Sequence, residues 1–367
     1  MRIEKFTNLY RDVTKEGTKI PQEKYCLTGQ FPIVDQGQRV IAGWWNDDAG
    51  IFKNVPAIIF GDHTRAIKYM EQPFFIGADG VKILRPTNIK DNPKYLYYAL
   101  QAAKIPNLGY SRHFKVVKEL QICIYSRDEQ NEIVRVLEKI DYLIEQRHAE
   151  TTYLDQLVKS RFIELFGDYD LTHPQESWVT IKEIGTVVGG ATPKTDHDEY
   201  WGGSYRWITP AELDGDSGYI YDSVRKLTKA GVESCSLQEM PVGTVILSSR
   251  APIGKVAIAG NTFYCNQGFK NIICKEGITP RYLYTVLLLN VEYLNSLGRG
   301  ATFKEISKGI VESIRIPVPS MELQQQFAAF VEQTDKSKYY SSLSFRYCQA
   351  AANTYRQEWM TCRTSDF

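Results

Sequence analysis

An internal repeat constrains the fold of this chain more than any other feature of its sequence. The stretch FFIGADGVKIL (74–84) matches FYCNQGFKNII (263–273), and further along PKYLYYAL (93–100) matches PRYLYTVL (280–287). Additional matches follow in the same order: GYSRHFK (109–115) with GRGATFK (298–304), and the strand-like ICI (122–124) with IRI (314–316). A pattern repeated at half the chain length is typical of a duplicated structural unit. We therefore expect two domains of one fold, which also suits a length of 367 residues.

Each repeat mixes strand and helix patterns. The apolar runs VPAIIFGD (55–62) and VGTVILSS (242–249) predict buried strands, whereas the segments beginning at Tyr95 and Tyr282 predict helices. Loops rich in glycine and aromatic residues are expected at AGWWNDDAG (42–50) and EYWGGSYRW (199–207). The predicted fold class is α+β, with two repeated α/β domains.

A long segment with few helix breakers follows each repeat. One face of each segment has residues at alternating spacings of four and three, which is the seam of a coiled coil with polar interruptions. In the first segment the seam comprises Ile133, Leu137, Ile140, Ile144, Arg147, Thr151, Leu154 and Val158. In the second it comprises Phe327, Val331, Thr334, Lys338, Ser341, Phe345, Cys348 and Ala352. We expect two long helices that pair with each other, antiparallel; the alternative is that each helix packs separately on a globular domain.

These patterns divide the chain at definite positions. The first domain is expected at 1–126, a helix at 127–168, the second domain at 169–319, a second helix at 320–360 and a tail at 361–367. A Pro-Val-Pro segment (317–319) ends the second domain, because proline is favoured at helix starts.

The charge distribution indicates a polyanionic partner, although the net charge is only +1. Residues 1–126 contain 18 Lys and Arg against 12 Asp and Glu, whereas residues 127–168 contain 6 against 10. A basic domain beside an acidic helix is consistent with nucleic-acid binding. No apolar run approaches the roughly 20 residues that span a bilayer, and the charged amino terminus is unlike a secretory signal. We expect a cytoplasmic protein with no membrane contact.

No catalytic or metal-binding motif is predicted. VGGATPKTD (188–196) resembles a phosphate-binding loop, but Pro193 occupies the place where that loop needs glycine. DNPKY (91–95) lacks the second proline of the Asn-Pro-Pro-Tyr motif of amino-methyltransferases. The seven cysteines include no CxxC pair and the five histidines have no metal-ligand spacing, so the cysteines are expected to be ordinary thiols. An enzyme with a dispersed site is not excluded by these observations.

Several segments together resemble one family. They are GDHTRAIKY (61–69), SSRAPIGKVAIA (248–259), IRIPVPS (314–320) and LDQLVKSRFIELFGD (154–168), and with the duplication and the two helices they look like the specificity subunit of a type I restriction-modification system. The resemblance implies two target-recognition domains, each reading one half of a split sequence in double-stranded DNA. It also implies that the helices set the spacing of the half-sites and bind two methyltransferase (modification) subunits, with separate restriction or motor subunits in the full complex.

The resemblance further implies a chain without catalytic residues, metal or cofactor of its own. S-adenosylmethionine would be bound by the modification subunits, and ATP with Mg²⁺ by the motor subunits. The segment 341–360 departs from the pattern, since it is poorer in charged and aliphatic residues than the first helix.

The candidate DNA-binding residues are polar side chains in glycine-rich loops or after predicted strands. Glycine lets a backbone approach phosphates, and Arg and Gln side chains can read base edges. The candidates are Gln36, Gln38, Arg39, Arg65, Lys68, Arg112, His113, Lys115, Arg250, Lys255, Lys270, Arg299, Thr302 and Lys304. The alternative for each is an ordinary charge in a solvated loop. The tryptophans at 44, 45, 201 and 207 are expected to pack in cores rather than to stack on bases.

Two other functions compete with DNA recognition. The chain could be a divergent standalone DNA methyltransferase or nuclease, or a helical scaffold whose two domains bind proteins.

Overall fold

The computed structural model describes residues 1–77, 79–213, 218–235, 237–250, 252–300 and 304–360. The chain forms two compact units, one made of Met1–Ala149 with the residues from Ser341 onward, the other of Glu150–Tyr340. Each unit therefore contains one of the two repeats and parts of both long helices. Within the described residues, no helix is both long enough and apolar enough to cross a membrane.

The described residues of the first unit form three small sheets. The four-stranded sheet has the order β2-β8-β5-β6, formed by Tyr10–Asp12, Val81–Pro86, Ala57–Gly61 and Ile67–Met70. The three-stranded sheet has the order β4-β3-β7, formed by Gly43–Trp45, Phe31–Val34 and Phe75–Ile76. A pair, β1 (Arg2–Lys5) with β9 (Gln121–Ile124), closes the domain. Its shorter helices are α1 (Phe6–Leu9), α2 (Pro93–Ala102) and α3 (Phe114–Val117), with 3-10 turns at Thr14–Glu16 and Gln22–Lys24.

The second unit repeats this arrangement. Its larger sheet has the order β11-β18-β15-β16-β13, formed by Gly185–Val188, Asn271–Cys274, Val245–Leu247, Val256–Ala259 and Tyr219–Ile220. Its smaller sheet has the order β14-β12-β17, formed by Arg225–Leu227, Trp201–Ile208 and Tyr264–Cys265, and β10 (Val179–Thr180) pairs with β19 (Arg315–Ile316). Its shorter helices are α5 (Ile181–Ile184), α6 (Lys229–Glu233), α7 (Pro280–Leu289), α8 (Val291–Ser296) and α9 (Lys308–Ser313), with 3-10 turns at Asp198–Tyr200 and Pro210–Glu212.

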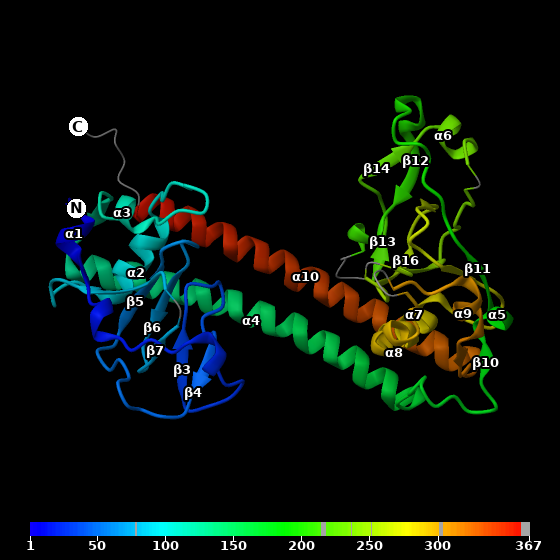
Figure 1. The fold of residues 1–367 in the computed structure, drawn as a ribbon, viewed down its shortest axis with the longest axis horizontal. Coiled ribbons are helices and arrows are strands. Elements are labelled where there is room, and N and C mark those ends of the chain that lie inside the picture. The colour runs from blue at the N-terminus through cyan, green and yellow to red at the C-terminus, as the bar shows by residue number, and fades with distance from the viewer. Residues whose placement is uncertain (78, 214–217, 236, 251, 301–303, 361–367) are drawn as a thin grey trace. The chain divides into compact units, whose positions relative to one another are not determined.

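The strand order of the first domain is preserved in the second, which adds only β13 at one edge of the larger sheet in the described residues. Helices α2 and α7 each begin with proline after a capping residue: Asn92 accepts hydrogen bonds from two helical N–H groups and Thr279 from one. Helix α2 lies beside the larger sheet of the first unit, and α7 lies beside that of the second (Figure 1). The predicted duplication is therefore a duplication of topology.

Three sequence expectations are corrected by the structure. The aromatic segments around Trp44 and Trp207 were expected as loops, but they form β4 and β12. The equivalent tyrosines Tyr95 and Tyr282 donate to the carbonyls of Cys123 (2.6 Å) and Pro317 (3.0 Å). Cys123 therefore corresponds to Pro317, so the sequence match of 122–124 with 314–316 is out of register by two residues. Cys123 is disulfide-bonded, so it is not an ordinary thiol.

The long helices are α4 (Arg127–Phe166) and α10 (Met321–Met360), each of 40 residues. Every residue of the two predicted seams is buried or half-buried. Within the second unit, the rings of Phe162 and Phe327 lie 5.4 Å apart in a core that Phe166 and Tyr282 complete. Within the first unit, Ile133 and Leu137 pack with the second helix's Met360.

A buried glutamine fastens the start of each long helix to the preceding domain. Gln130 accepts from the backbone N–H of Asn92 (2.7 Å) and donates to the carbonyl of Tyr125 (3.0 Å). Gln324 accepts from the N–H of Thr279 (2.8 Å) and donates to the carbonyl of Pro319 (2.9 Å). The same connection in both units holds the capping residue of the short helix against the first turn of the long one.

Candidate nucleic-acid interface

In the first domain three loops meet where strand β5 ends. The backbone N–H of Asp62 donates to the carbonyl of Gly80 (2.7 Å), and the Asp62 carbonyl accepts from the N–H of His113 (2.8 Å). The Asp62 carboxylate accepts from the N–H of Phe114 (2.7 Å). Because Asp62 is only 4% exposed, these bonds form in a place shielded from water, where they are stronger. The turn after β5 and the loop before α3 are thus held together.

A fourth segment, 35–39, joins the same junction. The side-chain oxygen of Gln36 accepts from the N–H of His63 (3.3 Å), and the hydroxyl of Thr64 donates to the carbonyl of Gln36. The ammonium of Lys68 donates to the carbonyl of Asp35 (2.7 Å) and lies 3.4 Å from its carboxylate. Candidates that are far apart in the sequence therefore gather at one edge of the domain.

Two of these candidates are buried side chains. Lys68 is 4% exposed and is held by Asp35, and burial lowers its pKa while the Asp35 carboxylate opposes that effect. His113 is 0% exposed, with its ring nitrogens bonded to the Asp62 carbonyl (2.9 Å) and to the N–H of Leu108 (3.1 Å). A buried polar group with its hydrogen bonds satisfied organises a loop. These two side chains support the junction from inside the domain.

The remaining first-domain candidates differ in exposure. Arg65 is half-buried, adopts a positive φ of 60° and donates to the carbonyl of Ile105 (3.3 Å), so its guanidinium is partly used inside the protein. Gln36 is half-buried. The exposed candidates are Gln38, Arg39, Arg112 and Lys115.

The second domain builds a matching junction. The N–H of Ser249 donates to the carbonyl of Gly268 (2.8 Å), and the Ser249 carbonyl accepts from the N–H of Ile306 (3.0 Å). These are the same two connections that Asp62 makes with Gly80 and His113 in the first domain. The alignment that placed Lys115 on Lys304 is therefore corrected, because the residue equivalent to His113 is Ile306.

Two second-domain lysines are also engaged inside the protein. Lys270 lies 3.1 Å from the carboxylate of Glu305 and 3.3 Å from the Ser249 hydroxyl, with its side chain 14% exposed. Lys255 is half-buried and donates to the carbonyl of Pro210 (3.1 Å). Arg250 is half-buried, and Arg299 and Lys304 are exposed. Thr302 lies outside the described residues.

The tryptophans are packed, as expected from their size. Trp207 is 2% exposed, and the other three of the set are half-buried. The guanidinium of Arg225 lies 3.5 Å from the centre of the Trp201 ring, a cation–π contact that covers one face of the indole.

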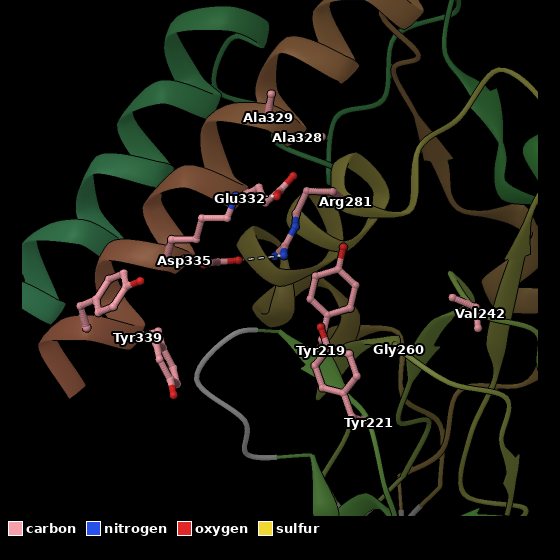
Figure 2. Close-up of a pocket in the computed structure, with 12 residues that line it drawn as sticks. Tyr219, Tyr221, Val242, Gly260, Arg281, Ala328, Ala329, Glu332, Asp335 and Tyr339 are labelled. Carbon is pink, nitrogen blue, oxygen red and sulfur yellow. Dashed lines mark hydrogen bonds and ion pairs between the residues drawn. The ribbon is translucent and has the colours of Figure 1, made fainter. Parts of the chain in front are cut away.

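The second unit also contains a tyrosine-lined cavity of about 740 Å³ that sequence reasoning missed. It lies between α10 and the β13 edge, and Figure 2 shows Arg281 directed toward Asp335, with the rings of Tyr219 and Tyr221 beside it. The guanidinium of Arg281 lies 2.9 Å from the carboxylate of Asp335, and both side chains are partly buried. Burial raises the pKa of Asp335, while Arg281 and Lys338 oppose that shift. Among the described residues, no group of three or more His, Cys, Asp or Glu side chains could hold a metal ion.

Comparison with known proteins identifies the family of this fold. The sequence model of the type I restriction modification DNA specificity domain matches the chain twice, over residues 10–153 and 176–339. The chain belongs to this family. Each of the two repeats is thus a copy of the specificity domain. The first match ends within α4 and the second within α10.

Relatives of this specificity-domain family resemble the chain to different extents. It is 43% identical over 185 residues to the type I restriction enzyme MjaIX specificity subunit of Methanocaldococcus jannaschii, covering 49% of this chain and less than half, 43%, of that relative. It is 26% identical over 346 residues to the EcoR124I/EcoR124II specificity subunit of Escherichia coli, covering 86% and 82% of the two chains. The crystal structure of the type I S subunit from M. genitalium matches 99% of this chain and 96% of that chain with a TM-score of 0.60 at 15% identity, which shows a shared fold.

Proposed function

We propose that this chain recognises a bipartite DNA sequence on behalf of a type I restriction-modification complex, with each domain reading one half-site. The observation that carries the proposal is the junction of loops that recurs in both domains, built on the backbone of Asp62 in one and Ser249 in the other. Each junction holds its loops by hydrogen bonds between backbone groups. A rigid support of this kind is what sequence reading needs, because base-reading side chains must be held in place.

Exposed basic side chains surround each junction. Arg39, Arg112 and Lys115 are exposed in the first domain, and Arg299 and Lys304 in the second. Phosphate contacts supply most of the affinity of DNA-binding proteins and position them on the duplex, whereas base contacts supply specificity. We assign these five side chains to the phosphate backbone, which lets the second domain bind DNA without a net positive charge.

The proposal includes antiparallel pairing of α4 with α10. Contacts inside each unit support it: Asp155 with Lys338 (2.5 Å) in the second unit, Arg147 with Ser341 (3.3 Å) and Asp141 with Arg356 in the first. From one contact to the next, the residue number decreases along α4 and increases along α10, which is the order expected of antiparallel helices. Forty helical residues extend for about 60 Å, so the helices are long enough to separate two half-sites on a duplex.

The long helices are also the proposed docking surface for two methyltransferase subunits. Monomeric proteins seldom expose many large apolar side chains along one element. The exposed ones on α4 and α10 are Tyr142, Leu143, Tyr153, Leu157, Met321, Tyr339, Tyr340, Leu343, Tyr347 and Trp359. Tyrosine is enriched where partners bind. In this scheme S-adenosylmethionine binds to the modification subunits and ATP with Mg²⁺ to the motor subunits, and this chain catalyses no reaction.

Duplex binding by the purified chain tests the proposal. Specific DNA affinity should fall steeply with salt, since counterions are released from the phosphates. Replacing Arg112 and Lys115 with alanine should weaken binding to all sequences alike and reduce the salt slope, whereas the exposed helix variant Lys139→Ala should bind as the wild type does. A chain that binds no duplex at low salt would support the protein scaffold instead. Binding of S-adenosylmethionine by the chain alone would support the standalone methyltransferase.

The spacing role has its own test. Inserting one heptad between Ile140 and Arg147 and another between Thr334 and Ser341 keeps the seam in phase and lengthens both helices by about 10 Å, or three base pairs. The methylated motif of a host that carries this variant with the modification subunits should keep both half-sites and gain about three base pairs between them. An unchanged gap would refute the spacing role.

A further inference from the structure

His63 and Arg250 occupy the same position in the two domains. The residue before each, Asp62 or Ser249, donates its backbone N–H to the carbonyl of the junction glycine, at 2.7 Å in one domain and 2.8 Å in the other. Arg65, the other arginine candidate after a predicted strand, is turned toward the carbonyl of Ile105. The structural counterpart of Arg250 is therefore His63, a residue to which the sequence assigned no role.

Both side chains lie over the junction glycine. A Cβ atom added to Gly80 would come within 3.1 Å of Cδ2 of His63, and one added to Gly268 would lie 3.5 Å from Nε of Arg250. Gly80 also has a positive φ of 91°, a conformation that other residues rarely adopt. Both glycines therefore leave room for a half-buried polar side chain beside the junction.

Each of these two side chains keeps unused hydrogen-bonding capacity. The ring of His63 stacks on Tyr110 with centroids 5.3 Å apart, and its Nδ1 atom, which is shielded from solvent, has no hydrogen-bond partner among the described residues. Among the described residues, the guanidinium of Arg250 makes no hydrogen bond or ion pair, and the carboxylate of Glu305, which pairs with Arg250 in a β-bridge, is bound by Lys270. A half-buried polar group that is held by its surroundings but not saturated is suited to bind a ligand.

We propose that His63 and Arg250 are the equivalent base-reading residues of the two half-sites, an inference that rests on the proposed function. Arginine binds the O6 and N7 atoms of guanine through two parallel hydrogen bonds. Histidine offers a single ring N–H beside its acceptor and can donate to the N7 atom of one purine. The half-site read by the second domain therefore contains a guanine that Arg250 contacts. The half-site read by the first domain contains a purine, contacted by His63, at the corresponding place.

The test uses the chain assembled with its modification subunits, and it maps the methylated sequence in host DNA. Arg250→Ala should relax one guanine of one half-site and weaken binding to the wild-type target about 10- to 100-fold, the range for a bidentate contact. His63→Ala should relax one purine of the other half-site by a smaller factor. Arg250→Lys keeps the charge but lacks the fork, so it should lose the discrimination and retain nonspecific affinity.

Matched controls and contrary outcomes are available. Lys229→Ala and His173→Ala change exposed side chains of similar type that lie outside the junction loops, and they should leave the motif unchanged. A folded Arg250→Lys complex that methylates only the wild-type motif would overturn the inference, as would a loss of affinity equal for matched and mismatched duplexes. If the wild-type complex itself methylates no defined sequence, the proposed function fails, and not only the assignment of these residues.

Discussion

Replacing Gln324 with leucine should destabilise the second unit and leave the first unit intact. Gln324 is 0% exposed, accepts from both the N–H and the hydroxyl of Thr279 (2.8 and 3.2 Å), and donates to the carbonyls of Gly277 (3.1 Å) and Pro319 (2.9 Å). Leucine fills a similar volume but makes none of these bonds. Four polar groups that the fold keeps close to Gln324 would lose a partner at once.

The magnitude follows from these contacts. A buried backbone N–H without an acceptor costs about 1–3 kcal/mol, while carbonyls and the hydroxyl recover part of their loss by rearrangement. A loss of about 3 kcal/mol in the free energy of unfolding is therefore expected. For a unit of this size that corresponds to roughly 6–12 °C in its midpoint of thermal unfolding.

Hydrogen exchange distinguishes the two units in one experiment. In Gln324→Leu, the amides of α7 should exchange about 100-fold faster, since 3 kcal/mol is slightly more than two factors of ten, while those of α2 keep the wild-type rate. Gln130→Leu should show the reverse pattern. The matched control is Gln325→Leu, because Gln325 is the exposed neighbour on the same helix. If α7 exchanges equally fast in Gln324→Leu and Gln325→Leu, the glutamine does not fasten the helix to the domain.

Three further predictions concern single side chains. Lys68→Met should lower the free energy of unfolding of the first unit by about 1–3 kcal/mol, because the carbonyl of Asp35 loses its donor, yet leave the salt dependence of DNA binding unchanged; a reduced salt slope would restore Lys68 as a phosphate contact. Phe162→Ala should destabilise the second unit by about 3–5 kcal/mol in chemical denaturation, since its ring is 1% exposed among aromatic rings, and a loss below 1 kcal/mol would contradict the core assignment. Burial raises the pKa of Cys265 to about 12, so its thiolate form is disfavoured in the folded state and stability should fall as pH rises above about 9. When the native protein is alkylated at pH 8 and analysed by mass spectrometry, the half-buried Cys235 should be labelled before Cys265. Labelling of Cys265 before Cys235 would refute its burial.

The sequence by itself determined the architecture of this protein, because repetition and periodicity are properties of the chain. Two copies of one pattern predicted two domains of one topology, which the matching strand orders bear out. The segments beginning at Tyr95 and Tyr282 predicted helices, and the structure places both in helices, α2 and α7. The heptad spacing selected the face of each long helix that the structure buries, because that spacing alone decides which side chains share a face.

Only the tertiary structure decided which polar side chains face outward at the loops. Lys68 and Arg39 are both basic residues near a turn, yet one is buried on the carbonyl of Asp35 and the other is exposed. Burial of a charge depends on whether a partner from a distant segment satisfies it, and no local pattern records that partner. For the same reason the sequence did not reveal that His63 and Arg250 are equivalent. Their equivalence depends on the backbone hydrogen bonds that the preceding residues make with Gly80 and Gly268, and not on residue type.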